Sequence, residues 1–236
     1  MTTPLYRDDA YLETCNATVT EVTERGGIVL DQTVFYPTGG GQPGDTGSLM
    51  HADGRLLEIA TTVTDRDTGN IVHVPGQAEP IPAFGDVIVC QLDVALRRAH
   101  MRTHTALHLL CSLVPFPVTG GQIGVDRGRL DFDIPDAAID KDDITSKINQ
   151  LIADDRAVST SWITDEELTA NPDLVRTMSV KPPMGHGRIR MVRIDDCDYQ
   201  PCGGTHVAST GEIGTVKVTK VEKKGAQNRR IRIEIA

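Results

Sequence analysis

The stretch V-A-L-R-R-A-H-M-R-T-H-T-A-L-H-L-L-C-S-L-V, residues 94–114, marks the point at which the character of the sequence changes. It contains neither Gly nor Pro and is followed by Pro115 and Pro117, so it predicts one helix that ends there. His100, His104 and His108 recur every four residues and would share one helix face. Two imidazoles one turn apart can bind one zinc ion, but the outer two lie about 12 Å apart along the axis. Spacing alone therefore leaves open which neighbouring pair binds a metal.

The residues before this helix have the shorter period that is typical of β-strands. Thr18–Val22 alternates polar and apolar side chains, and Gly26-Gly27 marks the turn that follows. Short runs with strand character continue at 27–30, 33–36, 47–51, 55–62, 70–74 and 86–92. Short strands with turn signals between them and no helical period predict a small antiparallel β-barrel over residues 1–93.

The residues after the helix mix helices with strands. Asp140–Arg156 carries apolar side chains at helical spacing, and Thr164 with Glu167 has the pattern of a capping box. Asn171-Pro172 predicts the start of another short helix, and strands are predicted at 188–194, 213–222 and 229–235. The predicted fold class is therefore α+β, in which the barrel precedes an α+β domain of antiparallel sheet and helices over residues 94–236.

Composition excludes several classes of protein. The chain has 236 residues, 39% hydrophobic and 24% charged, which suffices for a buried core in one or two domains. No apolar run approaches the roughly 18 to 20 residues of a membrane helix, and the N-terminus lacks the pattern of an export signal. The 5 Cys residues follow no disulfide framework. We therefore expect a soluble cytoplasmic protein with no membrane partner.

Charge is distributed unevenly along the chain, whose net charge is −9. Residues 1–93 hold 14 acidic and 4 basic residues, whereas residues 94–236 hold 19 acidic and 20 basic ones. Because local surface charge governs contact with a polyanion, the C-terminal third is the part expected to touch phosphate.

A second candidate ligand group is Cys202-Gly203-Gly204-Thr205-His206. Two glycines allow a tight turn that aims the Cys and His side chains at one point, and thiolate with imidazole is a preference of zinc. Each motif alone has an ordinary explanation, a polar helix face or a turn with an inert Cys. Together in one domain they predict a zinc site. Asp198 is a candidate to hold a ligand imidazole in its tautomer, the alternative being a solvated carboxylate.

These motifs resemble a known family. H-T-A-L-H-L-L at 104–110 and C-G-G-T-H-V at 202–207 resemble the editing domain of alanyl-tRNA synthetases, and still more its free-standing relatives, the AlaX alanyl-tRNA editing proteins. The resemblance extends to Q-I-G at 122–124, L-D-F-D at 130–133 and T-G-E-I-G at 210–214. In the N-terminal part, F-Y-P-T-G-G-G-Q-P-G-D-T-G at 35–47 resembles the family's glycine-rich signature, as in the AlaX form with an N-terminal β-barrel.

The resemblance implies a metal site, a reaction and a partner. Position by position, it assigns one Zn²⁺ per chain to His104, His108, Cys202 and His206 and leaves His100 outside the ligand set. It implies hydrolysis of the 3′ aminoacyl ester of tRNA(Ala) mischarged with serine or glycine, and no nucleotide cofactor. The alternatives are a catalytically idle, zinc-stabilised tRNA-binding module and an editor of another aminoacyl-tRNA, such as threonyl-tRNA mischarged with serine. F-Y-P-T-G-G-G-Q-P favours the alanyl branch.

The resemblance also suggests a substrate pocket. Gln122 matches a family Gln that faces the substrate, the alternative being a loop Gln in solvent. Leu107 stands where synthetase editing domains often have Thr, so we expect a more apolar pocket. Gly39, Gly40 and Gly41 belong to a turn without the G-K-[ST] ending of a phosphate-binding loop. The resemblance implies that this turn leans over the editing site, where backbone can approach a small substrate closely.

Basic residues gather in 217–232, where Glu222 is the one acidic residue. We predict that they contact tRNA phosphates, with a solvated hairpin as the alternative. The sequence has no aromatic-rich motif for single-stranded RNA, so binding should depend strongly on salt. The predicted contacts are Lys217, Lys220, Lys223, Lys224, Arg229 and Arg230.

Overall fold

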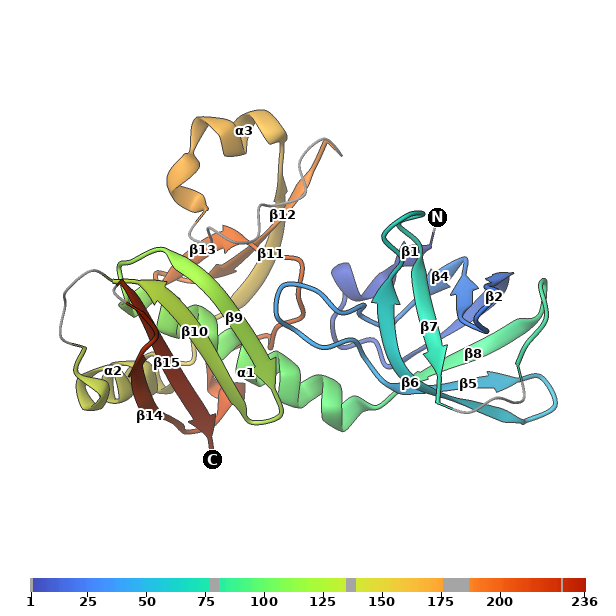
Figure 1. Cartoon of the computed structure of the whole chain (residues 1–236), viewed down its shortest axis with the longest axis horizontal. Coiled ribbons are helices and arrows are strands. Elements are labelled where there is room, and N and C mark those ends of the chain that lie inside the picture. Colours follow the sequence, from blue (N-terminus) through green and yellow to red (C-terminus); the bar gives the residue numbers. More distant parts are fainter. Residues whose placement is uncertain (1, 77–80, 135–138, 176–186, 226) are drawn as a thin grey trace. The chain divides into compact units, whose positions relative to one another are not determined.

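The computed structural model describes residues 2–76, 81–134, 139–175, 187–225 and 227–236. Contacts within the chain divide it into two units, Met1–Arg98 and Ala99–Ala236, which are described separately below (Figure 1). The assignment of 1–93 and 94–236 as functional domains stays a prediction, because contacts alone do not define function.

The first unit is a closed antiparallel barrel, as predicted. Its strands follow the order β2-β3-β7-β6-β5-β8, and their apolar side chains alternate toward a buried interior that includes Leu30, Leu49 and Ile59. Two short strands, β1 (Thr3–Pro4) and β4 (Gln32–Thr33), pair in parallel beside it, next to the 3₁₀ turn η1 (Leu5–Arg7). The barrel strands are β2 (Thr14–Val22), β3 (Ile28–Leu30), β5 (Gly47–His51), β6 (Leu56–Thr64), β7 (Ile71–Pro75) and β8 (Val87–Leu92).

The strand predicted at 33–36 is wrong beyond Thr33. The Tyr36 N–H donates to the Asp45 carboxylate at 2.5 Å instead of joining a strand ladder. Asp45 in turn forms a buried ion pair with Arg97, whose guanidinium also donates to the Val34 carbonyl at 2.6 Å. The Asp45 side chain therefore fixes the backbone at Tyr36. Strand propensity does not predict this, because it considers only the residues of the segment itself.

The helix predicted at 94–114 is confirmed as α1 (Val94–Leu113), which begins in the first unit and continues into the second. Asp93 starts it by accepting the Leu96 N–H at 3.0 Å, and the segment before Pro115 ends it. In the part of the chain that the structure describes, no helix is both long and apolar enough to span a membrane.

The main sheet of the second unit has the order β14-β15-β10-β9 and is antiparallel throughout. A Cβ on Gly128 would lie 2.9 Å from Thr103 Cγ2 and 3.0 Å from Leu107 Cδ1, so this face of the sheet packs on α1. We call the opposite face the outer face. The strands of the main sheet are β9 (Val118–Gly124), β10 (Arg127–Asp133), β14 (Val216–Lys223) and β15 (Asn228–Ile235).

Residues on the outer face follow from strand alternation and register. Arg129 lies opposite Gln122 and Arg232, and Asp131 lies opposite Arg230. On the next pair of strands, Lys220 lies opposite Arg232 and Glu222 opposite Arg230. The remaining outer-face positions are Gly120, Gly124, Arg127, Asp133, Lys217, Asn228 and Glu234.

Helix α2 (Lys141–Ala153) covers β14, where Asn149 exchanges two hydrogen bonds with the backbone of Val216 at 2.7 and 2.9 Å. It is the helix predicted from 140, with Asp140 as its N-cap. The capping box of Thr164 and Glu167 is also confirmed, at the start of α3 (Asp165–Ala170).

A second antiparallel sheet, β11-β12-β13, positions part of the candidate site. The Asn171-Pro172 signal corresponds to a 3₁₀ turn, η2 (Pro172–Leu174), and a further one, η3 (Thr210–Ile213), precedes β14. The strands are β11 (Val158–Ile163), β12 (Ile189–Ile194) and β13 (Asp198–Pro201).

Candidate metal centre

Helix α1 presents two histidines on one buried face. His104 and His108 are four residues apart, and their ring centroids are 5.2 Å apart. His100 is buried one turn earlier on the same helix. It is not a member of the one cluster of potential metal ligands that the described residues form.

Strand β13 leads directly into the turn that carries the other two candidate ligands. The Cys202 N–H donates to the Arg190 carbonyl at 3.1 Å, which extends the β12–β13 pairing by one residue. The buried Arg190 guanidinium then donates to the carbonyls of Cys202 and Gly204, at 3.0 and 2.9 Å. These bonds bend the backbone around Gly203 so that Cys202 and His206 turn toward α1.

The four side chains converge. The ligand atoms of His104, His108, Cys202 and His206 all lie within 4.8 Å of one another. Cys202 Sγ is 3.6 Å from His104 Nε2 and 3.3 Å from His206 Nε2. Across a tetrahedral zinc ion with bonds of about 2.3 Å to sulfur and about 2.0 Å to nitrogen, such atoms would be about 3.5 Å apart. The donor set and its spacing fit a single metal ion.

Outer hydrogen bonds fix the orientation of two of the imidazoles. His108 Nδ1 lies 2.8 Å from Asp198 Oδ2, which leaves Nε2 as its remaining ring nitrogen. Gln200 Nε2 donates to the same Asp198 oxygen at 2.8 Å. His206 Nδ1 lies 3.1 Å from Thr105 Oγ1, a buried hydroxyl that donates to the Met101 carbonyl. Partners of this kind hold the ring and tautomer of a metal-binding His.

The electrostatics of the cluster favour a bound cation. Burial by itself raises the pKa of the Cys202 thiol, but His104 and His206 lower it by more, so that it lies well below the usual value. Burial lowers the pKa of His108, whereas Asp198 and Cys202 raise it to about 10. Burial and the neighbouring His104 hold the pKa of His206 well below its usual value. A thiolate and a carboxylate thus attract positive charge toward the cluster, which a metal ion would supply.

Comparison with known proteins decides the family. The chain is 34% identical to the alanyl-tRNA editing protein AlaX-M of Methanosarcina acetivorans over 98% of each chain, and 35% identical to that of Methanosarcina barkeri over 98% of each. It belongs to the alanyl-tRNA editing protein family. The family resemblance read from the motifs is thereby confirmed.

Three further comparisons show the similarity of this chain to aminoacyl-tRNA synthetases. The alanine–tRNA ligase of Halobacterium salinarum is 36% identical over 94% of this chain, which corresponds to 25% of the ligase. The model of the threonyl and alanyl tRNA synthetase second additional domain matches residues 189–232, which include Cys202 and His206. The model of class II (A) tRNA synthetases matches residues 10–96.

The residues predicted to line a substrate pocket lie in different parts of the fold. Leu107 is buried on α1 against Gly128, beside the ligand pair. Gln122 lies on the outer face of the main sheet, is exposed, and accepts from Arg129 Nε at 3.3 Å. The structure therefore does not bring Gln122 together with Leu107, and its role in a pocket stays a prediction.

The predicted glycine-rich turn belongs to the first unit. Gly39 and Gln42 exchange backbone hydrogen bonds of 3.0 and 2.8 Å around Gly40 and Gly41, whose φ values are +55° and +85°. These left-handed conformations favour glycine, so the local turn explains part of the motif. Its part in substrate selection stays a prediction.

The predicted RNA-binding residues divide between the two faces of the β14–β15 hairpin. Lys217, Lys220 and Arg230 lie on the outer face, whereas Lys223 and Arg229 lie opposite each other on the other face. Lys224 follows β14, and its Nζ is 3.9 Å from Glu222 Oε1 on the outer face.

Sequence reasoning missed the residues that support the cluster from outside. Arg190, Gln200 and Thr105 show no spacing that marks them as part of a site, because their partners are distant in the chain or are backbone carbonyls. Thr105 carries the one usable signal, since it stands next to His104 in the helix motif.

Proposed function

We propose that this protein is a trans-acting, zinc-dependent deacylase that hydrolyses the 3′ aminoacyl ester of tRNA(Ala) mischarged with serine, and also with glycine. The observation that carries the proposal is the convergence of three imidazoles and one thiol in a member of the alanyl-tRNA editing protein family. We expect it to act in the cytoplasm, where aminoacyl-tRNA is used.

The proposed ligands are His104, His108, Cys202 and His206, with one zinc ion per chain. A mixed thiolate and imidazole set suits zinc better than magnesium or calcium, which prefer oxygen. Zinc in this position would supply Lewis acidity toward the ester or hold the amine of the amino acid. Asp198 holds His108, and Thr105 holds His206, each through the Nδ1 atom of the ring. The Nε2 atom of each ring is then left to bind the metal.

The remaining roles fall to groups that position substrate. Leu107 adds apolar surface next to the proposed ligand pair, which suits a small substrate side chain. The ribose hydroxyl next to the ester can assist the reaction, so the site needs no separate general base of its own. The glycine-rich turn at Gly39–Gly41 is the proposed means of separating serine from alanine.

The alternative that differs in class is an idle tRNA-binding module in which zinc only stabilises the fold. It is favoured by the number of protein ligands, since four ligands are typical of closed structural zinc sites. The two functions differ in turnover, because only an enzyme deacylates substrate in molar excess over itself.

A deacylation assay with Ser-, Gly- and Ala-tRNA(Ala) tests the proposal. The metal-loaded protein should release serine and glycine over many turnovers, leave Ala-tRNA(Ala) intact, and lose activity to a chelator with recovery on added Zn²⁺. Release of no more than one equivalent would favour the idle module. Activity on threonyl-tRNA mischarged with serine, and none on Ser-tRNA(Ala), would make it an editor of a different tRNA.

A further inference from the structure

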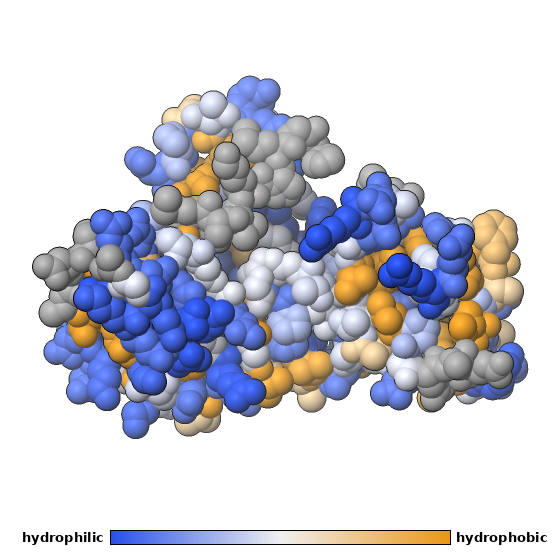
Figure 2. Space-filling model, in the orientation of Figure 1, coloured by the Kyte–Doolittle hydropathy of each residue, from blue (hydrophilic) through white to orange (hydrophobic). Residues whose placement is uncertain are grey.

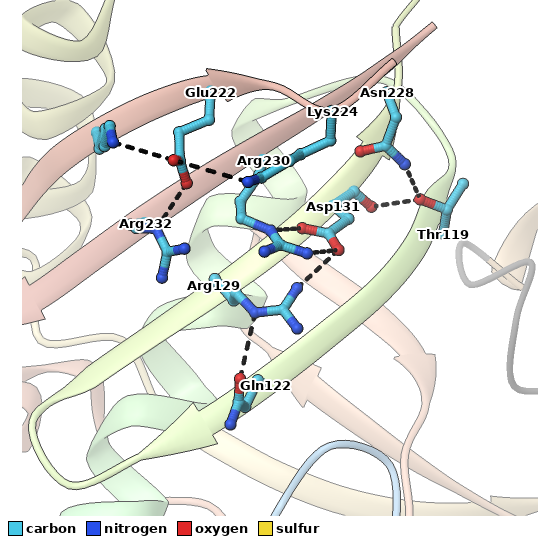
Figure 3. A network of polar contacts seen from close by, with 10 residues as sticks. Thr119, Gln122, Arg129, Asp131, Glu222, Lys224, Asn228, Arg230 and Arg232 are labelled. Atoms are coloured by element: carbon cyan, nitrogen blue, oxygen red, sulfur yellow. Dashed lines mark hydrogen bonds and ion pairs between the residues drawn. The ribbon is translucent and has the colours of Figure 1, made fainter.

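The outer face of the main sheet carries a charged network that the metal centre does not use (Figure 3). Asp131 on β10 binds two arginines. Arg230 Nε and Nη2 donate to its two carboxylate oxygens at 2.7 and 2.8 Å, and Arg129 Nη1 donates at 2.7 Å. Arg129 Nε is held from its other side by Gln122 Oε1 at 3.3 Å.

The neighbouring hairpin repeats the arrangement around Glu222 on β14. Arg232 Nε donates to Glu222 Oε2 at 2.7 Å, and Lys220 Nζ lies 3.0 Å from Oε1. Lys224 Nζ approaches the same oxygen at 3.9 Å. Two carboxylates thus hold five cationic side chains, which leaves three positive charges on a protein whose net charge is −9.

The carboxylates lie lower in the network than the cations. The Asp131 and Glu222 side chains are 13% and 16% exposed, and those of Arg129 and Arg230 are 22% and 20% exposed. The side chains of Lys220, Lys224 and Arg232 project furthest, at 63%, 44% and 42% exposed. Figure 2 shows hydrophilic surface gathered where Figure 1 draws β10, β14 and β15. An approaching partner therefore meets the positive groups first.

The network also prepares the arginines for an anion. A guanidinium has five N–H donors in a fixed fork, and Asp131 and Gln122 occupy only some of those on Arg129 and Arg230. The free donors keep a defined orientation because the carboxylate holds the other side of the group. Ordering these side chains before binding reduces the entropy lost when a phosphate arrives.

The chemistry of the face indicates double-helical RNA. None of the outer-face positions of β9, β10, β14 and β15, all of which the structure describes, is aromatic, so unpaired bases have no ring to stack on. Gly120 and Gly124 have no side chain, so two of the outer-face positions of β9 carry no projecting group. A positively charged surface without stacking groups suits the phosphates and ribose hydroxyls of a duplex.

We propose that the acceptor-stem duplex of the RNA substrate lies on the outer face of the β14–β15–β10–β9 sheet, with its phosphates against Arg129, Arg230, Arg232 and Lys220. The inference rests on the proposed function, because it takes the substrate to be an aminoacyl-tRNA. The ester is at the end of the unpaired 3′ strand, so the duplex and the metal centre need not coincide. Arg129 is thereby added to the basic residues of 217–232 that the sequence indicated.

The test is binding of two uncharged RNAs, a hairpin of the acceptor-stem sequence and a single strand of equal length. The variant Arg129→Ala/Lys220→Ala removes one cation from each carboxylate and orphans neither, since Asp131 keeps Arg230 and Glu222 keeps Arg232. It should raise the Kd for the hairpin by at least about 10-fold and reduce the slope of log K against log salt by about two units or slightly less.

The matched control is Lys147→Ala/Arg193→Ala, which removes one Lys and one Arg from exposed positions on α2 and β12. Its net charge equals that of the test variant, so long-range electrostatics cancel. The control should change the Kd by less than about twofold. Arg129→Lys/Lys220→Arg keeps both charges but loses the fork of Arg129, so it should keep the salt slope of wild type and lose less affinity than the double Ala variant. If the test variant misfolds by circular dichroism, Lys220→Ala/Lys224→Ala replaces it, at two well-exposed positions.

Equal effects in test and control variants, or no effect in the test variant, would overturn the inference. Equal loss of affinity for the single strand would overturn the choice of a duplex. Single-turnover hydrolysis of Ser-tRNA(Ala) separates the two proposals. If wild type never hydrolyses the ester, the proposed function fails whatever the hairpin does. If it hydrolyses the ester and the test variant keeps both KM and Kd, the inference fails alone.

Discussion

Two groups of buried histidines, one in each unit, use their ring nitrogens differently. In the barrel, His73 Nε2 lies 2.8 Å from Thr33 Oγ1 and Nδ1 lies 3.0 Å from the Ile28 carbonyl, so the protein satisfies both nitrogens. In the second unit, His108 and His206 each have Nδ1 held by a side chain, while the other nitrogen joins the cluster with Cys202. Burial therefore does not distinguish a structural His from a candidate metal ligand, whereas the use of the second nitrogen does.

Among variants of the two histidine groups and their surroundings, Cys202→Ala should have the largest effect, on both zinc content and deacylation rate. Loss of the thiolate leaves three imidazoles to hold the metal, so the protein should lose its bound zinc and more than about 100-fold in deacylation rate. Cys197→Ala is the control, since the Cys197 sulfur lies 3.1 Å from Ser112 Oγ and outside the cluster. Metal analysis and single-turnover rates that fall equally in both variants would remove Cys202 from the ligand set.

Asp198→Asn should have the next largest effect. The amide keeps the size of the side chain but removes the charge that orients His108, so zinc affinity should fall by about 10- to 100-fold. Competition with a chromogenic chelator measures it. Asp195→Asn makes the same chemical change at an exposed position in the turn after β12 and should leave the affinity unchanged. An unchanged affinity in Asp198→Asn would make the hydrogen bond to His108 irrelevant to the metal.

His73→Leu should affect stability and leave metal content intact. It removes the ring that accepts from the Thr33 hydroxyl and donates to the Ile28 carbonyl, which should cost about 1 to 3 kcal/mol at pH 7. Burial holds the pKa of His73 at about 4, so the folded state favours the neutral ring. Its contribution is complete above about pH 6.5 and declines as the pH falls toward 4, by about 3 kcal/mol in all.

Urea unfolding followed by circular dichroism at pH 7 and pH 5 measures this effect. Wild type should lose more stability between the two values than His73→Leu does, because the variant has no imidazole to protonate there. All other titrating groups are common to the two proteins and cancel in the difference. Equal losses would mean that the pKa of His73 is the same in the folded and unfolded states.

His100→Ala should have the smallest effect. His100 is one turn from His104, in the same His-x-x-x-His spacing as the ligand pair, but is not a member of the cluster. Zinc content should remain at about one per chain, whereas His104→Ala should lose it. Loss of metal in His100→Ala with retention in His108→Ala would shift the ligand pair by one turn.

Prediction from sequence succeeded where the signal was local. Helix α1 was predicted from an uninterrupted run ended by prolines, and the α3 capping box from two residues three positions apart. Strands β9, β10, β11 and β13 were not predicted. β9 carries Gly120, Gly121 and Gly124, which hide an alternating pattern, and its strand character depends on pairing with β10.

The sequence by itself determined the family, the α+β class and the two motifs whose side chains converge, because each motif is short and its residue types restrict the chemistry. It left open which pair of α1 histidines belongs to the cluster, and only the resemblance to a family selected one. The tertiary structure decided the rest. The contact with His108 decides between the two interpretations of Asp198, and Thr105 acts on His206, far away in the chain. Strand register separates Arg230 from Arg229 onto opposite faces. Such relations depend on how distant segments pair, and no local pattern of residues records them.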